Sequence, residues 1–208
     1  YNNHNKITQG GMDMSKKIIT INRMFGSGGR AIGKALAEDL GIGFYDKELI
    51  DIASKEKQIP FDTFAKVDEK KANQWRFPID NEIQIDKDMH FIPMNDILFD
   101  IQRQIISDVA QKEDCVIVGR CANHILSDKT LSVFIYAPFE KRVENVIART
   151  GREEKSARKL VKKMDKERRS YYEYFTDHKW LDMTQYQLCI DSSQFSQEQI
   201  IKIIKSSI

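Results

Sequence analysis

The chain has 208 residues, a formal net charge of +2 and 41% hydrophobic residues. This length suits one α/β domain with a substantial core, and the near-neutral charge gives no support for a nucleic-acid or membrane partner. No apolar run approaches the roughly 20 residues of a membrane-spanning helix, so we expect a soluble protein of the cytoplasm. The three cysteines, Cys115, Cys121 and Cys189, lack the spacing of metal ligands, which is typical of free thiols in a reducing compartment.

The first residues of the chain, 1–16, are polar, contain Gly10-Gly11 and include two possible starts at Met12 and Met14. We interpret them as a flexible N-terminal extension. The remainder, 17–208, is expected to form a single domain.

The stretch from Ile18 to Leu40 reads as a β-branched strand, a glycine-rich turn and an amphipathic helix, which Gly41 ends. In this arrangement the backbone N–H groups of the turn and the positive end of the helix dipole face a phosphate. The sequence therefore predicts a phosphate-binding loop, although a turn with no ligand accounts for the same residues.

The standard phosphate-loop pattern is Gly, four residues, then Gly-Lys-Ser/Thr, and this chain does not match it. With Gly28 as the second glycine, Gly29 occupies the lysine position and Arg30 the next one. Ala31 follows, where a magnesium-binding hydroxyl would sit. Either Arg30 or Arg23, at the end of the strand, is expected to restore the missing positive charge.

A short buried strand at 43–46 is predicted to run into a helix from Lys47 to about Lys57. The strand delivers Tyr45, Asp46 and Lys47 to the edge where parallel α/β sheets bind ligands. From 58 to 94 the pattern loses its period, so we interpret this segment as a substrate-binding insertion that closes over the sheet edge. An irregular surface excursion fits the same residues.

A helix is predicted from an Asn95 N-cap through Gln111, and a fully apolar strand follows it at 115–118. Gly119 and Arg120 come directly after this strand, at the ligand-binding edge of the predicted sheet. Arg120 is therefore a candidate ligand-binding residue.

A basic, polar turn that includes Arg152 lies at 149–160 and is predicted to be a lid, followed by a long helix from about 156 to 175. Most charges on such a helix are solvated. Arginines beside a mobile turn also suit a lid, because they neutralise the charge on a transferred phosphate. Asp165 and Arg168 share one face of this helix and are candidates to hold substrate or each other.

The remaining elements are a strand at 131–137 with a helix at 139–150, a last strand at 187–191 and a C-terminal helix that starts at Ser196. This alternation of strands and helices indicates right-handed crossovers and a parallel sheet.

Taken together, the chain from about Lys17 to Ile204 resembles the cytidylate kinase-like family, a branch of the P-loop nucleoside monophosphate kinases. The resemblance is carried, in order, by Ile19-Thr20-Ile21-Asn22-Arg23 with Gly26-Ser27-Gly28-Gly29-Arg30, Phe44-Tyr45-Asp46-Lys47-Glu48-Leu49-Ile50, Cys115-Val116-Ile117-Val118-Gly119-Arg120-Cys121-Ala122-Asn123, Met164-Asp165-Lys166-Glu167-Arg168 and Ile190-Asp191-Ser192-Ser193. It implies an α/β, three-layer P-loop kinase fold with a five-stranded parallel sheet, an inserted monophosphate-binding region at 58–94 and a helical lid at 149–160.

The resemblance also implies ATP and Mg²⁺ as cofactors and a nucleotide of the CMP or dCMP type as substrate, with no metal site formed by the protein alone. Residues expected to bind the nucleotide cofactor are Arg23, Gly26, Ser27, Gly28, Gly29, Arg30 and Ala31. Residues expected to bind the substrate are Tyr45, Asp46, Lys47, Arg120, Asp165 and Arg168. Catalytic positive charge is expected from Arg30, Arg120, Arg152 and Arg168.

Four positions depart from the pattern of cytidylate kinases. Gly29 replaces a lysine, Ala31 a small hydroxyl residue, Lys47 a serine, and Cys121 the aspartate that follows the arginine matching Arg120. Two other functions therefore stay open. Gly29 and Ala31 favour a non-catalytic nucleotide-binding or regulatory protein, and Cys121 favours a kinase of a different small molecule.

Overall fold

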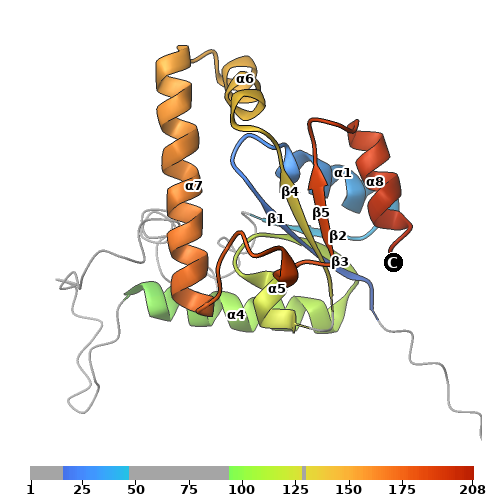
Figure 1. Cartoon of the computed structure of the whole chain (residues 1–208). Coiled ribbons are helices and arrows are strands. Elements are labelled where there is room, and N and C mark those ends of the chain that lie inside the picture. The colour runs from blue at the N-terminus through green and yellow to red at the C-terminus, as the bar shows by residue number, and fades with distance from the viewer. Residues whose placement is uncertain (1–15, 47–93, 128–129) are drawn as a thin grey trace, which may run out of the picture.

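The computed structural model describes residues 16–46, 94–127 and 130–208 (Figure 1). The predicted N-terminal extension, the helix from Lys47 and the substrate-binding insertion lie almost wholly outside the described residues. Lys47 itself, a predicted substrate-binding residue, also lies outside them.

A five-stranded, all-parallel sheet forms the middle layer of the molecule. In spatial order its strands are β2 (Gly43–Tyr45), β3 (Cys115–Val118), β1 (Ile18–Arg23), β4 (Leu131–Tyr136) and β5 (Leu188–Asp191). In the central strand, Ile21 lies opposite Val118 of β3 and Val133 of β4. The predicted five-stranded parallel sheet is therefore confirmed.

Helices cover both faces of the sheet. They are α1 (Gly29–Leu40), α4 (Met94–Lys112), α5 (Ala122–Leu126), α6 (Phe139–Thr150), α7 (Glu154–Thr176) and α8 (Gln197–Lys205), with a 3₁₀ turn η3 (Met183–Gln185). Helices α1 and α8 pack on one face, and α4 and α5 pack on the other. Helix α7 stands beside α6 and reaches α4, where the rings of Phe99 and Phe175 stack with centroids 4.1 Å apart. None of the described helices has both the length and the apolarity that a bilayer crossing needs.

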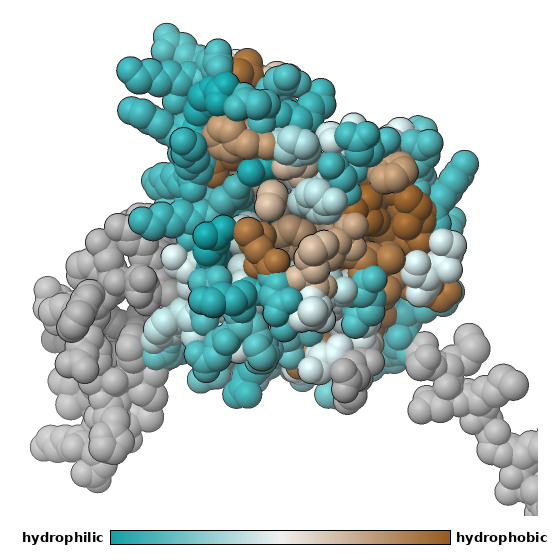
Figure 2. Space-filling view, viewed as in Figure 1, coloured by the Kyte–Doolittle hydropathy of each residue, from teal (hydrophilic) through white to brown (hydrophobic). Residues whose placement is uncertain are grey.

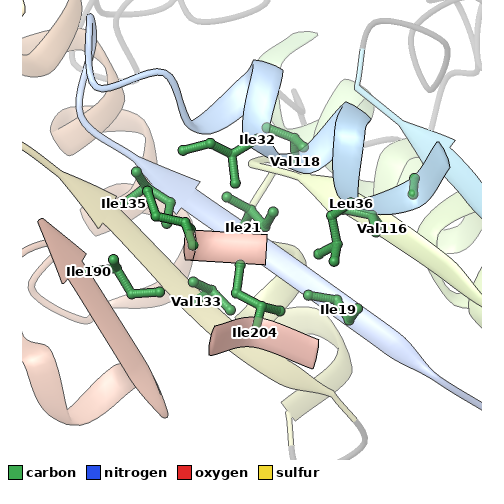
Figure 3. Close-up of a cluster of buried hydrophobic side chains, with 12 residues drawn as sticks. Ile19, Ile21, Ile32, Leu36, Val116, Val118, Val133, Ile135, Ile190 and Ile204 are labelled. Atoms are coloured by element: carbon green, nitrogen blue, oxygen red, sulfur yellow. The ribbon is translucent and has the colours of Figure 1, made fainter. Parts of the chain in front are cut away.

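The main core lies between the sheet and the α1–α8 layer (Figure 3). Ile19 and Ile21 of β1 and Ile135 of β4 are almost completely buried there, and Leu36 of α1 and Ile204 of α8 pack onto them. Runs of β-branched residues suit strands that are covered on both faces. Burial of this core fixes β1 and α1, and therefore the ends of the loop that joins them.

The helix ends agree with the sequence signals at Gly41 and Ser196 and differ at Asn95, and two short elements were not predicted. Gly41, at φ +66°, caps α1 through its N–H, and Ser196 opens α8 in a reciprocal capping box with Gln199. Helix α4 already includes Met94, so Asn95 lies inside its described part and is not its N-cap. The short elements α5 and η3 were not predicted, because five and three residues are too few to show a helical period.

Candidate active site

Charged residues from three neighbouring strands meet at one edge of the sheet. Arg23 ends β1, Asp46 follows β2, and Gly119 and Arg120 follow β3. Because the strands are parallel, their carboxyl ends all lie at this edge, which is where open α/β sheets bind ligands. The structure thus brings together Arg23, Asp46 and Arg120, as the sequence predicted.

The loop from Met24 to Gly28 joins β1 to α1, and it needs glycine at its tip. Gly26 has φ +85°, and a Cβ atom there would lie 2.6 Å from the carbonyl oxygen of Arg142. Helix α1 then begins after Gly28 with no side-chain cap. The N–H groups of its first turn have no intrahelical partner and carry the positive end of the dipole, so this terminus is suited to bind an anion.

Ser27, predicted to bind the cofactor, uses its hydroxyl to hold the loop in place. Its Oγ lies 2.9 Å from the carbonyl oxygen of Met24 and 3.0 Å from that of Ile135 in β4. The hydroxyl of Ser192, after β5, donates to the carbonyl of Ser27 at 2.7 Å. The side chain of Ser27 therefore shapes the loop, and the loop offers a ligand its backbone.

Asp46 connects the two arginines of the loop region. Its carboxylate is 7% exposed and accepts a hydrogen bond from Arg30 Nε at 2.6 Å, and its other oxygen lies 3.8 Å from Arg23 Nη2. The side chain of Arg23 is 11% exposed, whereas that of Arg30 is 51% exposed. Asp46 therefore holds both guanidinium groups at the sheet edge, one inside and one at the surface.

The corner after β3 is strained. Gly119, Arg120 and Cys121 have φ angles of +82°, +58° and +55° in succession. Residues other than glycine are uncommon in this region, and each costs of order 1 kcal/mol there. The corner is fixed by hydrogen bonds from Gly119 N to Ile21 O and from Ala122 N to Gly119 O. Backbone strain of this kind is often found at functional sites, where it orients a side chain.

Three arginines converge on a small cavity of about 20 Å³ beside this corner. Arg23, Arg120 and Arg168 line it, together with Cys121 and aromatic side chains of α7 and the segment after it. Arg168 also donates from Nη1 to the carbonyl oxygen of Arg23 at 3.2 Å. Three like charges around one space favour an anion in it. The volume suits one small group, such as part of a phosphate, and not a whole nucleoside.

A buried polar network supports the floor of this cavity. Asn22 donates to Asn123 Oδ1 at 3.0 Å and to the hydroxyl of Tyr186 at 3.3 Å, and Asn123 donates to the hydroxyl of Tyr172 at 2.8 Å. The hydroxyl of Tyr186 donates to the carbonyl of Trp180. These bonds join β1, α5, α7 and the segment before β5, so the cavity walls are positioned by satisfied buried polar groups.

Asp165 binds the loop. Its Oδ1 accepts the N–H of Phe25 at 2.8 Å, and its Oδ2 pairs with Arg142 of α6. Arg142 is buried, and it also donates to the carbonyl oxygens of Ala137 and Phe25. We call this pair the Arg142–Asp165 clamp, because it joins α6, α7 and the phosphate loop.

Arg142 was not among the site residues predicted from the sequence. One signal was present: Arg142 lies three residues after Phe139 and four before Val146, so it falls on the apolar stripe of its helix. A charge at such a position has to be paired within the protein, because its stripe faces the core.

Two other predicted site residues lie away from the cavity in this structure. The hydroxyl of Tyr45 donates to Glu113, just before β3 begins, and burial together with this carboxylate raises the pKa of Tyr45 to about 12. Arg152 is exposed in the turn between α6 and α7, 3.5 Å from Ser156 Oγ. At a rise of about 1.5 Å per residue, the start of α7 lies about 21 Å along the helix from Arg168.

Cations of α6 and α7 gather on two aromatic rings near the loop. The guanidinium groups of Arg149 and Arg168 lie 5.4 and 5.3 Å from the ring centroid of Phe25. Arg158 and Lys162 approach the ring of Phe139 at 5.7 and 5.5 Å. Figure 2 shows that the end of the molecule where α6 and α7 meet is mostly hydrophilic. Arg149 and Arg168 thus border the loop at Phe25, while Arg158 is also paired with Glu140 and Glu154.

The described residues fit a phosphate group better than a metal held by the protein alone. Within 16–46, 94–127 and 130–208 there is no group of three His, Cys, Asp or Glu side chains with metal-site geometry. Mg²⁺ is commonly bound through one or two carboxylates and the phosphates of a substrate. Asp46 is a buried carboxylate at the same sheet edge, where it contacts Arg23 and Arg30 on either side of the loop.

Cys121 provides a test of this geometry. It is 2% exposed in the cavity wall, and burial raises the pKa of its thiol to about 12. At pH 8 about one such thiol in ten thousand is ionised. We expect iodoacetamide to label Cys121 at least 100-fold more slowly in the folded protein than in guanidinium chloride, by peptide mass spectrometry. The rate should rise about tenfold per pH unit while the fold persists; rapid labelling at pH 8 would contradict the buried position.

Comparisons with known proteins identify the family of the chain and agree with its fold. A model described as the cytidylate kinase-like family matches residues 18–194. The cytidylate kinase of Methanopyrus kandleri is 24% identical in an alignment of 202 positions that covers 92% of this chain and 92% of that protein. The crystal structure of an uncharacterized protein from Eubacterium ventriosum is 32% identical, has a TM-score of 0.65 and covers 92% of this chain and 99% of its own. A shikimate kinase from Bacteroides thetaiotaomicron has a TM-score of 0.54 at 15% identity, covering 91% and 96%, which is a likeness of fold alone.

Proposed function

Because the chain belongs to the cytidylate kinase-like family, we propose that it is an ATP-dependent phosphotransferase. Its acceptor would be a nucleoside monophosphate of the CMP or dCMP type, or a related small acceptor with an anionic group. The observation that carries this proposal is the convergence of Arg23, Arg120 and Arg168 on one cavity beside an uncapped helix N-terminus.

The two halves of such a site have different chemistry. The N–H groups from Gly26 to Arg30 and the helix dipole would hold the phosphates of ATP, and the cavity arginines would hold the anionic group of the acceptor. Mg²⁺ would be held by the phosphates, with Asp46 as the protein carboxylate at this edge, and would supply charge neutralisation.

Phosphoryl transfer depends mainly on positioning and on stabilising the charge of the transferred group. The buried network holds the walls of the cavity that Arg120 and Arg168 line, so we expect these charges to need little rearrangement at the moment of transfer. Arg152 and the rest of 149–160 would act by closing over the site, and Lys47 and the insertion at 58–94 would complete the acceptor pocket.

The proposal is tested with the purified protein, Mg²⁺-ATP and a panel of CMP, dCMP, UMP, AMP and GMP, measured by coupled ADP release. We expect acceptor-dependent ADP formation, with one monophosphate preferred. Omission of the acceptor is the matched control for simple ATP hydrolysis. No acceptor-dependent release across the panel would contradict transfer to nucleoside monophosphates.

A second function is favoured by a specific observation. Gly29 and Ala31 stand where the pattern of cytidylate kinases has a lysine and a small hydroxyl residue, which fits a non-catalytic nucleotide-binding or regulatory protein. Calorimetry measures ATP binding and the coupled assay measures transfer, so the two measurements together separate the two functions. Saturable ATP binding without transfer to any acceptor would support the regulatory protein, and binding with transfer would support the kinase.

A further inference from the structure

We propose that Arg23 supplies the positive charge that a lysine supplies in the standard phosphate loop, which rests on the phosphotransferase function proposed above. With Gly28 as the second glycine of Gly-x₄-Gly-Lys-Ser/Thr, Arg23 stands in the first glycine position and Gly29 in the lysine position. The chain therefore exchanges the two residue types: the cation moves to the strand end, and the glycine moves to the helix start.

The structure gives this exchange a steric reason. A Cβ atom on Gly29 would lie 2.6 Å from Cβ and 3.1 Å from Cγ of Arg23, and 3.3 Å from Cβ of Ile135. The stem of Arg23 thus occupies the space in which a side chain at position 29 would begin. A lysine at 29 and an arginine at 23 exclude one another, because neither stem can give way without moving backbone.

The far end of Arg23 is also fixed. A Cβ atom on Gly119 would lie only 2.2 Å from Nη1 of Arg23, so the guanidinium group lies directly over the end of β3. Asp46 attracts the same group from the side of β2. Arg23 therefore lies across the sheet edge from the start of α1 to the cavity that Arg120 and Arg168 share with it. A cation in this place borders both the loop that would hold the donor phosphates and the acceptor cavity.

Arg30, the alternative, is turned elsewhere. Its Nε donates to Asp46 at 2.6 Å, its guanidinium carbon lies 5.8 Å from the ring centroid of Phe44 in β2, and its side chain is half exposed. Arg30 thus faces β2 and solvent, and it is not among the residues around the cavity. We assign the lysine's role to the buried arginine and a supporting role to the exposed one.

The experiment that tests this proposal moves the positive charge from position 23 to position 29, where the standard loop has its lysine. Arg23→Gly, Gly29→Lys and the double variant Arg23→Gly/Gly29→Lys are compared with the wild-type protein for thermal melting and for Mg²⁺-ATP binding by calorimetry. Arg23→Gly should weaken ATP binding at least about tenfold, because a charge-assisted contact is lost. Gly29→Lys should lower the melting temperature through the clash with Arg23. The double variant should recover both the melting temperature and most of the ATP affinity.

A second set keeps the result interpretable if a glycine variant folds poorly. Arg23→Gln should lose more ATP affinity than Arg30→Gln, and Arg103→Gln, an exposed arginine of α4, should lose none. A larger loss in Arg30→Gln, or a double variant no better than its two parents, would overturn the assignment of Arg23 and leave the proposed function intact. A wild-type protein that binds no nucleoside triphosphate would overturn the proposed function instead.

Discussion

Replacing Arg120 with alanine is expected to reduce phosphoryl transfer by about 100- to 1000-fold, the loss typical of removing one fixed donor to a developing negative charge. Arg120 is held by the strained corner after β3 and lines the cavity with Arg23 and Arg168. The measurement is the steady-state rate of ADP release with the preferred acceptor at saturation.

Two control variants distinguish the loss of the positive charge from a loss of structure. Arg120→Lys keeps the charge and should retain more activity than Arg120→Ala, although it loses the planar, bidentate geometry of the guanidinium group. Arg103→Ala removes an exposed arginine that is 59% accessible and should leave the rate unchanged. Near-normal turnover in Arg120→Ala, with a folded protein, would contradict the assignment of Arg120 to the transfer site.

Breaking the Arg142–Asp165 clamp is expected to have the largest effect on stability. The side chains of Arg142 and Asp165 are 8% and 19% exposed, so either substitution leaves a poorly solvated charge behind. We expect Arg142→Met to lower the free energy of unfolding by about 3–5 kcal/mol, the range for removal of one partner of a buried pair. Urea unfolding followed by circular dichroism measures this change.

The comparison with a surface pair makes the clamp prediction specific. Lys141 and Glu144, on the same helix, form an ion pair at 3.1 Å in which both side chains are at least half exposed. Lys141→Met should change the free energy of unfolding by less than about 0.5 kcal/mol. The double variant Arg142→Met/Asp165→Leu should be more stable than Arg142→Met alone, because no buried charge remains. Equal effects of Lys141→Met and Arg142→Met would contradict the clamp.

The sheet and most helices could be predicted because their signals are local and periodic. The apolar run at Cys115–Val118 marks a central strand, and Gly41 and Ser196 mark helix ends through their own backbone chemistry. The parallel direction of the strands followed from the alternation of strands and helices, and their number followed from the resemblance. The spatial order of the strands was not predicted and comes from the structure. Helix α5 was not predictable, because it is a single short turn whose start is set by the left-handed corner at Cys121.

The candidate site was predictable only in outline. Residues that follow parallel strands had to meet at one edge, which located Asp46 and Arg120. The partners of each charge could not be read from the sequence, because they lie on separate elements that only the fold brings together. Arg30 and Asp46 are 16 residues apart, and Phe25 and Asp165 are 140 residues apart. From the sequence, Asp165 was predicted to hold substrate or to pair with Arg168. In this structure it is engaged with the loop at Phe25 and with Arg142.

The left-handed corner at Arg120 and Cys121 has a consequence for engineering this protein. Glycine would adopt the same backbone angles without the penalty of about 1 kcal/mol at each position. At position 121 this gain is offset, because glycine would remove a buried thiol from a packed cluster. A selection for heat resistance should therefore favour glycine at position 120, where it would discard a cation of the candidate site. Variants ranked by melting temperature and variants ranked by turnover should then diverge at this residue first, which is a trade-off between stability and activity at a single position.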